Sequence, residues 1–338
     1  MRGMVYKTAV IGLGNIGFQF NLDNLRKETW SHVSAYGKCE KTELVGAVEV
    51  NDGKINLFKQ QYKNVPVFKT TKELMGNLSI DIVSICTPTE SHYHILKEVL
   101  EYPVKGIFCE KPLASTIEEA KELVQKCKNK QVLLSVNHTR RWDERYLYVK
   151  KIIQGGKIGN IKAINALYPG QVFNIGTHLF DTIRMLIQEN PETVSGISFN
   201  LENNDPNISG WIQFGKHIPC TVIATGKREA LIFEVDVIGT EGRVRILENG
   251  EKIELFSFVE SLRYSGYREL SVVPVNTPQT IDRFVEAVTD IVKVIDGEKS
   301  EANCTGKDGL YALAMSLAML ESAKKQGILV KVGTKNAL

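Results

Sequence analysis

The sequence has few cysteines, no cysteine pairs and no long apolar run. Its 338 residues include six cysteines, scattered along the chain without a C-x-x-C pair. This pattern predicts free thiols in a reducing cytoplasm and no metal site. No stretch reaches the roughly 20 apolar residues that a membrane-spanning helix needs, and no repeat or low-complexity tract is present. These absences favour a globular cytoplasmic protein that does not span a membrane.

An excess of charge of one sign is also missing. The chain has 42 Lys and Arg against 39 Asp and Glu, a net charge of +3, with no dominant basic block. Neither nucleic acid nor an anionic membrane is therefore expected as the main partner. The length predicts about two domains.

Apolar strand-like runs alternate with amphipathic helical segments over the first 138 residues. The alternation predicts a parallel sheet covered on both faces, here a doubly wound Rossmann domain over residues 1–138. Helices are expected at 89–100 and 116–128. The expected strands cover residues 8–11, 44–49, 65–68, 80–86, 106–109 and 132–136.

Residues 139–338 show a different pattern, with strands in succession. They predict an α/β domain for substrate binding and oligomerisation, whose mostly antiparallel sheet packs one face on helices. Its helices are expected at 143–154, 177–188, 280–295 and 309–325. Its strands are expected at 161–167, 195–201, 210–214, 221–225, 231–238, 243–247 and 252–258.

The first strand leads into a G-x-G-x-x-G motif formed by Gly12, Gly14 and Gly17, with Asn15 and Ile16 between the last two. The first glycine permits a tight turn, the second lets backbone approach a pyrophosphate, and the third allows close helix packing. The N-terminus of the following helix is expected to offer N–H groups to the phosphates. The motif predicts a dinucleotide site.

Glu49 follows the second strand and is the candidate partner of the adenosine ribose. It lies further along than usual because residues 20–31 form an insertion in the first crossover. A carboxylate accepts hydrogen bonds from a ribose diol and repels a 2′-phosphate. No Arg or Lys occupies positions 50–52, so NAD is favoured over NADP.

Thr87 and Pro88 follow the fourth strand, where a doubly wound sheet changes direction and binds ligands. They are expected near the nicotinamide. His92 lies just beyond them, where it either contacts the cofactor or packs at a helix start.

Glu110 and Lys111 follow the fifth strand, and Pro112 comes next. Charged groups at the carboxyl edge are expected near the nicotinamide, where a lysine can stabilise a developing alkoxide. From spacing alone, a strand-end salt bridge explains the pair equally well.

These motifs, together with the later segment Asn174 to Asp181, resemble the Gfo/Idh/MocA oxidoreductases over nearly the whole chain. The resemblance implies a Rossmann domain followed by an α/β domain with an open-faced sheet. It also implies NAD(P)-dependent chemistry on sugars, cyclitols or sugar nucleotides, and it gives Lys111 a catalytic role. Because an open sheet face favours association, we expect a homodimer or homotetramer.

The family's second motif, Asp-x-x-x-His-x-x-Asp, reads here from Asn174 through His178 to Asp181. The resemblance makes His178 the acid/base, a role that suits an imidazole at neutral pH. Asp181 is expected to orient the imidazole or contact substrate. Asn174 replaces the first acid, so it can bind substrate but cannot accept a proton.

Further candidates for substrate binding are Arg141, after the last Rossmann strand, and Tyr168. A guanidinium can grip a sugar or fork to a phosphate, although a solvated helix start explains Arg141 nearly as well.

The sequence thus predicts hydride transfer between NAD and a hydroxyl or keto carbon of a sugar-type substrate. Two alternatives stay open. One is an NAD-dependent glycoside hydrolase of the same fold, and the other is a dinucleotide-sensing regulator without turnover.

Overall fold

The computed structural model describes residues 4–279 and 282–333. The described chain divides into two compact units, one formed by residues 4–142 with 282–310 and the other by residues 143–279 with 311–333. The second unit is therefore not the continuous segment expected from residue 139 onwards. Residues 282–310 join the first unit because the apolar face of the helix at 283–295 packs against that unit. Apolar periodicity predicts that a helix has a buried face, but it does not predict which domain covers that face.

The first unit contains a six-stranded parallel sheet. Its strand order is β3-β2-β1-β4-β5-β6, so the direction of winding reverses between β1 and β4. This is the doubly wound order of a Rossmann fold. The strands are β1 (Tyr6–Ile11), β2 (Thr42–Val48), β3 (Val67–Phe68), β4 (Ile82–Ile85), β5 (Gly106–Cys109) and β6 (Leu133–Val136).

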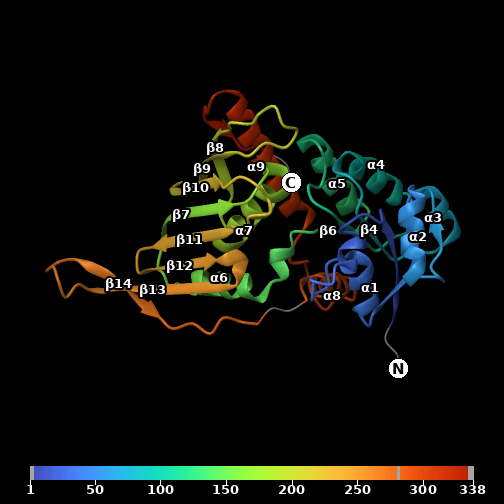
Figure 1. Cartoon of the computed structure of the whole chain (residues 1–338), viewed down its shortest axis with the longest axis horizontal. Coiled ribbons are helices and arrows are strands. Elements are labelled where there is room, and N and C mark those ends of the chain that lie inside the picture. Colours follow the sequence, from blue (N-terminus) through green and yellow to red (C-terminus); the bar gives the residue numbers. More distant parts are fainter. Residues whose placement is uncertain (1–3, 280–281, 334–338) are drawn as a thin grey trace. The chain divides into compact units, whose positions relative to one another are not determined.

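Helices connect these strands (Figure 1). Thr116 caps α5, since its hydroxyl accepts from the Glu119 N–H while the Glu119 carboxylate accepts from the Thr116 N–H. This reciprocal capping box fixes where the helix begins. The helical elements of this unit include η1 (Gln19–Leu22), α1 (His32–Lys38), α2 (Asp52–Gln61), α3 (Thr71–Asn77), α4 (Thr89–Val99), α5 (Ile117–Asn129), η2 (Thr139–Trp142) and α8 (Arg283–Ile295).

The second unit contains a nine-stranded mixed sheet with the order β14-β13-β12-β11-β7-β10-β9-β8-β15. β7 pairs parallel with β10 and antiparallel with β11. The strands are β7 (Ile161–Tyr168), β8 (Pro191–Ile197), β9 (Ser209–Phe214), β10 (Ile218–Ala224), β11 (Glu234–Gly239), β12 (Gly242–Leu247), β13 (Lys252–Glu260), β14 (Arg268–Val273) and β15 (Val330–Lys331).

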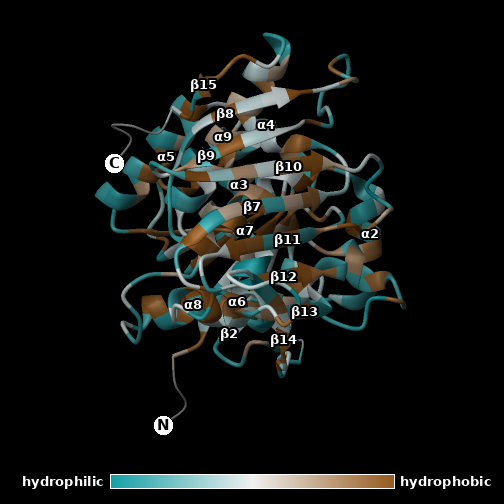
Figure 2. Cartoon of the chain, turned by 90° about the vertical axis from the view of Figure 1, so that its left-hand side faces the viewer, coloured by the Kyte–Doolittle hydropathy of each residue, from teal (hydrophilic) through white to brown (hydrophobic). Residues whose placement is uncertain are grey.

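One face of this sheet is covered by α6 (Glu144–Gln154), α7 (Thr177–Ile187) and the greater part of α9 (Gly306–Lys324), whereas the other face is open (Figures 1 and 2). Along β11 and β12, buried residues alternate with partly exposed ones. This period of two is the signature of a sheet covered on one side. The expected architecture is confirmed.

Some sequence-based boundaries were wrong. β8 starts at Pro191 and ends at Ile197, where the sequence predicted 195–201, because the exposed Phe199 lies in the following loop. β14 was not predicted, since its exposed residues carry little apolar pattern. The expected start of a helix at residue 280 lies outside the described residues.

None of the described helices combines the length and apolarity needed to cross a membrane.

Candidate active site

The glycine loop after β1 has the geometry that a dinucleotide requires. Gly12 has φ of +96°, and a Cβ there would lie 2.8 Å from the carbonyl oxygen of Cys86. A Cβ on Gly17 would lie 2.0 Å from the Gly12 carbonyl oxygen. A Cβ on Gly14 would meet only the Lys54 ammonium, at 3.9 Å. Two glycines thus serve close packing, and Gly14 leaves room for a pyrophosphate against the backbone.

The helix expected directly after this loop is replaced by a turn. The Phe18 N–H donates to the Gly14 carbonyl at 2.9 Å, the short 3-10 helix η1 follows, and α1 begins only at His32. The loop's own turn, which includes Asn15 and Ile16, therefore lies where the sequence predicted the N-terminus of a helix. The insertion at residues 20–31 is the reason, because it interrupts the crossover.

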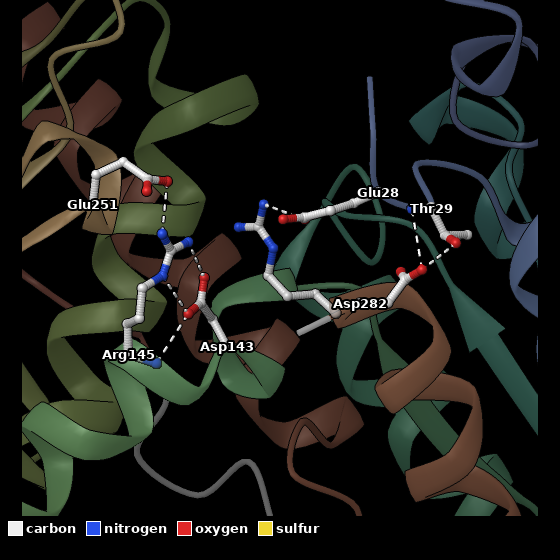
Figure 3. Close-up of polar contacts among 7 residues, drawn as sticks. Glu28, Thr29, Asp143, Arg145, Glu251 and Asp282 are labelled. Carbon is white, nitrogen blue, oxygen red and sulfur yellow. Dashed lines mark hydrogen bonds and ion pairs between the residues drawn. The ribbon is translucent and has the colours of Figure 1, made fainter. Parts of the chain in front are cut away.

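The start of α8 holds the end of that insertion in place (Figure 3). The Asp282 carboxylate accepts hydrogen bonds from the backbone N–H and the hydroxyl of Thr29. The Arg283 guanidinium lies 3.7 Å from the Glu28 carboxylate. The entry into α1 is thereby fixed.

Glu49 lies where the sequence predicted it, directly after β2 and beside the glycine loop. Its buried carboxylate accepts from the N–H groups of Leu13 at 2.9 Å, Val50 at 2.9 Å and Asn51 at 3.0 Å. A carboxylate has about four lone-pair positions, so capacity for a ribose hydroxyl remains. The Lys54 ammonium lies 4.0 Å from this carboxylate. The sequence showed no Arg or Lys at positions 50–52, but this lysine follows two positions later.

Thr87 and Pro88 follow β4, next to the point where the sheet reverses direction. His92 is 1% exposed. Its ring nitrogens lie 2.8 Å from the Thr87 carbonyl oxygen and 2.9 Å from that of Pro112. His92 therefore joins two loops at the carboxyl edge of the sheet. Among the residues described here, no group of three or more His, Cys, Asp or Glu could hold a metal ion.

Glu110 and Lys111 follow β5 at the same edge. The Glu110 carboxylate is buried and lies 3.0 Å from His32 Nε2 and 2.6 Å from the Asn137 amide nitrogen. Burial opposes its ionisation, but the hydrogen bond and charge of His32, the Lys111 charge and the Asn137 amide together lower the pKa of Glu110. Glu110 is thus a buried anion beside the partly exposed Lys111.

In the second unit, Asn174 lies in a π-helical turn, η3 (Val172–Gly176), that runs directly into α7. His178 is the second residue of α7 and is partly exposed, whereas Asp181, one turn later, is 1% exposed. Turns of this kind are frequent at functional sites. The motif residues expected to act together thus share one continuous helical segment.

Asp205, in the loop before β9, holds this turn. Its two carboxylate oxygens accept from the backbone N–H groups of Phe173 at 2.8 Å and Asn174 at 3.0 Å. Asp205 was not predicted from the sequence, because it lies in a polar loop with no periodicity.

Arg141 and Tyr168 have partners within their own units. Arg141 is 7% exposed and donates to the Asp308 carboxylate and to the Asn303 carbonyl, both at 2.9 Å. Tyr168 is fully buried, and its hydroxyl donates to the Ile208 carbonyl at 2.6 Å. These contacts give both side chains a structural task, and their binding of substrate stays a prediction.

The polar residues behind Glu110, which are His32, Ser84 and Tyr36, were also not predicted from the sequence. One signal was present, because Ser84 is a polar residue within the otherwise apolar strand β4. A buried hydroxyl needs a hydrogen-bond partner, so its position already indicated a polar contact inside the unit.

Comparisons with known proteins cover nearly all of the chain. Residues 6–138 match the GFO_IDH_MocA oxidoreductase family, NAD-binding Rossmann fold, and residues 150–332 match its C-terminal alpha/beta domain. A solved structure of myo-inositol 2-dehydrogenase from Lactobacillus plantarum superposes with a TM-score of 0.77. It is 21% identical, and the match covers 97% of this chain and 99% of that one.

Among curated relatives, an uncharacterized oxidoreductase of Schizosaccharomyces pombe is 30% identical over 194 residues, covering 52% of this chain and 50% of the relative. The match therefore spans about half of that relative's length. The 1,5-anhydro-D-fructose reductase of Ensifer adhaerens is 26% identical over 279 residues, covering 75% of this chain and 80% of the relative. Because both domain profiles match in order over most of its length, the chain belongs to the GFO_IDH_MocA oxidoreductase family.

Proposed function

We propose that the chain is an NAD-dependent oxidoreductase that transfers hydride between nicotinamide and a hydroxyl-bearing carbon of a sugar or cyclitol. The observation that carries the proposal is the position of Lys111. It follows β5 beside a buried anion, at the carboxyl edge where the glycine loop also lies. Ligands of doubly wound sheets bind at this edge.

The glycine loop and Glu49 would hold NAD, which when bound accepts a hydride from the substrate carbon. Lys111 donates a hydrogen bond to the reacting oxygen and stabilises its negative charge. His178 takes the hydroxyl proton as the carbon loses its hydride, so that a carbonyl forms. Asn174 holds a further hydroxyl group of the substrate, and Asp181, buried one turn after His178, orients the imidazole.

The choice of NAD over NADP rests on Glu49, whose carboxylate is placed to accept from a ribose hydroxyl and to repel a 2′-phosphate. Lys54 weakens that repulsion from 4.0 Å away. We therefore expect Lys54→Ala to increase the preference for NAD, measured as the ratio of kcat/KM with the two cofactors. A fall in that ratio would contradict the role given to Glu49.

The central test is NADH formation with a panel of myo-inositol, scyllo-inositol, aldoses and UDP-sugars. His178→Ala should lower turnover about 100- to 10,000-fold, the usual contribution of general acid–base catalysis. Lys111→Ala should cost about 100-fold or more, as for loss of an oxyanion donor. Both variants should still bind NAD.

Other outcomes identify the alternatives. Hydrolysis of a glycoside without net NADH would indicate a hydrolase that uses NAD catalytically. Binding of NAD without turnover of any substrate would favour a dinucleotide-sensing regulator. Full turnover by Lys111→Ala would remove the mechanism.

We also propose that the protein forms a homodimer or homotetramer through the open face of the nine-stranded sheet. Apolar residues lie on that face among polar ones: Ile223 is exposed, and Leu167, Trp211, Ile238 and Phe256 are partly exposed. Such a surface favours association. Light scattering should show an oligomer that Ile223→Lys weakens, and a monodisperse wild-type monomer would contradict the proposal.

The six cysteines are free and buried, in keeping with a cytoplasmic location.

A further inference from the structure

The first residue of α1, His32, is fully buried although it follows a polar insertion. Its ring lies 4.6 Å from the Phe108 ring and 5.5 Å from the Phe284 ring, measured between centroids. A polar ring in apolar surroundings needs partners for both nitrogens. Nδ1 lies 2.8 Å from the Ser84 hydroxyl, and Nε2 lies 3.0 Å from the Glu110 carboxylate.

The contacts continue into a chain. The Tyr36 hydroxyl lies 2.7 Å from the Ser84 hydroxyl. Because an ionised carboxylate can only accept, Nε2 donates to Glu110, and the Ser84 hydroxyl, which can donate or accept, is the partner of Nδ1 in either protonation state of the imidazole. Ser84 in turn accepts from Tyr36, whose pKa is raised by burial, so that it keeps its proton. One arrangement of protons thus satisfies every link.

The far end of the chain is Glu110, the residue before Lys111. Its other oxygen accepts from the Lys111 backbone N–H at 3.3 Å, while Asn137 holds the oxygen that faces His32. The Lys111 charge is among the causes that lower the pKa of Glu110. Both oxygens of the carboxylate are thus fixed, one of them by the backbone N–H of Lys111 itself, so the carboxylate is a fixed charge next to the lysine in the chain.

We propose that His32 is a positioning residue for the reaction. It fixes the Glu110 carboxylate, which holds Lys111 in the orientation that contacts the reacting oxygen. This inference rests on the proposed role of Lys111. Precise geometry matters because small displacements of a catalytic group lower the rate of the chemical step while leaving binding intact.

The test compares His32→Leu with His32→Gln, whose amide can still donate to Glu110. We expect kcat of His32→Leu to fall about 10- to 100-fold, by analogy with the loss of residues that orient metal ligands. KM and the NAD dissociation constant should stay near their wild-type values, and His32→Gln should recover much of the loss. Leu123→Ala in α5, a buried site of the same unit, is the control for lowered stability alone and should keep its kcat.

A second measurement does not depend on turnover. According to the proposal, the Glu110 carboxylate holds the Lys111 ammonium, which should then react slowly with acetic anhydride because the carboxylate favours its charged form. Peptide mass spectrometry should show faster acetylation of Lys111 in His32→Leu, and an unchanged rate in Leu123→Ala. If His32→Leu does not fold, Ser84→Ala breaks the same chain and should produce a smaller change in the same direction.

A double-mutant cycle with Glu110→Gln shows whether His32 acts through Glu110. The two effects on kcat should then be far from additive. Additive effects, or unchanged kcat and Lys111 acetylation in His32→Leu, would overturn the inference. If Lys111→Ala itself keeps full turnover, the proposed function fails instead, and the acetylation result still decides whether His32 positions the lysine.

Discussion

The two units differ in whether a polar residue within a strand indicates a specific hydrogen-bond partner. In the first unit, every residue of β4 and β5 is buried, since helices cover both faces of a parallel sheet. Polar groups then concentrate at strand ends, and a polar residue inside a strand, such as Ser84, indicates a specific partner. In the second unit, every other residue of β11 and β12 faces the open side. A polar residue there needs no special explanation.

The largest effect is expected in the first unit, on NAD binding by the glycine loop. Gly17→Val places a side chain where even a Cβ would lie 2.0 Å from the Gly12 carbonyl oxygen. We expect loss of NAD binding in isothermal titration calorimetry and a destabilisation of at least about 1–3 kcal/mol. Gly37→Ala in α1 has nothing within 4 Å of the added Cβ and should bind NAD normally. Equal NAD affinity in both variants would contradict the role of the loop.

The corresponding change in the second unit is Asp205→Ala. It leaves the N–H groups of Phe173 and Asn174 without their carboxylate, at a cost of about 1–3 kcal/mol. Because these groups form the turn that carries Asn174 into α7, kcat should fall while the NAD dissociation constant stays unchanged. Stopped-flow measurement of turnover, together with NAD titration, checks whether kcat falls while NAD affinity is unchanged. Weaker NAD binding with unchanged kcat would place Asp205 outside the catalytic segment.

Acid should affect the first unit through Glu110. Its pKa in the folded protein is below the ordinary value of 4.5. The stability gained from its ionisation is therefore fully present above pH 4.5 and is lost as the pH falls through the lower, folded-state pKa. Urea unfolding of wild type and Glu110→Gln should show a difference that shrinks as the pH falls through this range. If the difference in unfolding free energy between the two proteins grows on acidification, ionised Glu110 does not stabilise the fold.

The smallest effect is expected from Thr116→Ala, which removes the cap of α5. The cap is far from the glycine loop in sequence and serves only the helix start, so stability should fall by about 1 kcal/mol. Turnover and NAD affinity should stay at wild-type values. A change in either would mean that α5 does more than cover the sheet.

The sequence predicted the fold class well because both sheets have distinctive periodicities. Continuous apolar runs marked the strands of the first unit, and alternating or near-continuous apolar residues marked most of those in the second. It missed β14 because exposed strand residues such as those from Arg268 onwards follow no burial pattern. The prediction of a helix directly after Gly17 was wrong. The glycine motif specifies only the turn, and the insertion that follows can adopt several local structures.

By itself, the sequence determined the features that depend on neighbouring residues, namely the glycine turn, the acid after β2, the lysine after β5 and the His178 helix. Only the tertiary structure decided which distant groups support them. His32 reaches Glu110 across 78 positions, and Asp205 reaches Asn174 across 31. Local propensity and periodicity act over a few turns or strands, whereas these contacts depend on how whole elements pack. The same reason explains why α8, late in the chain, completes the first unit.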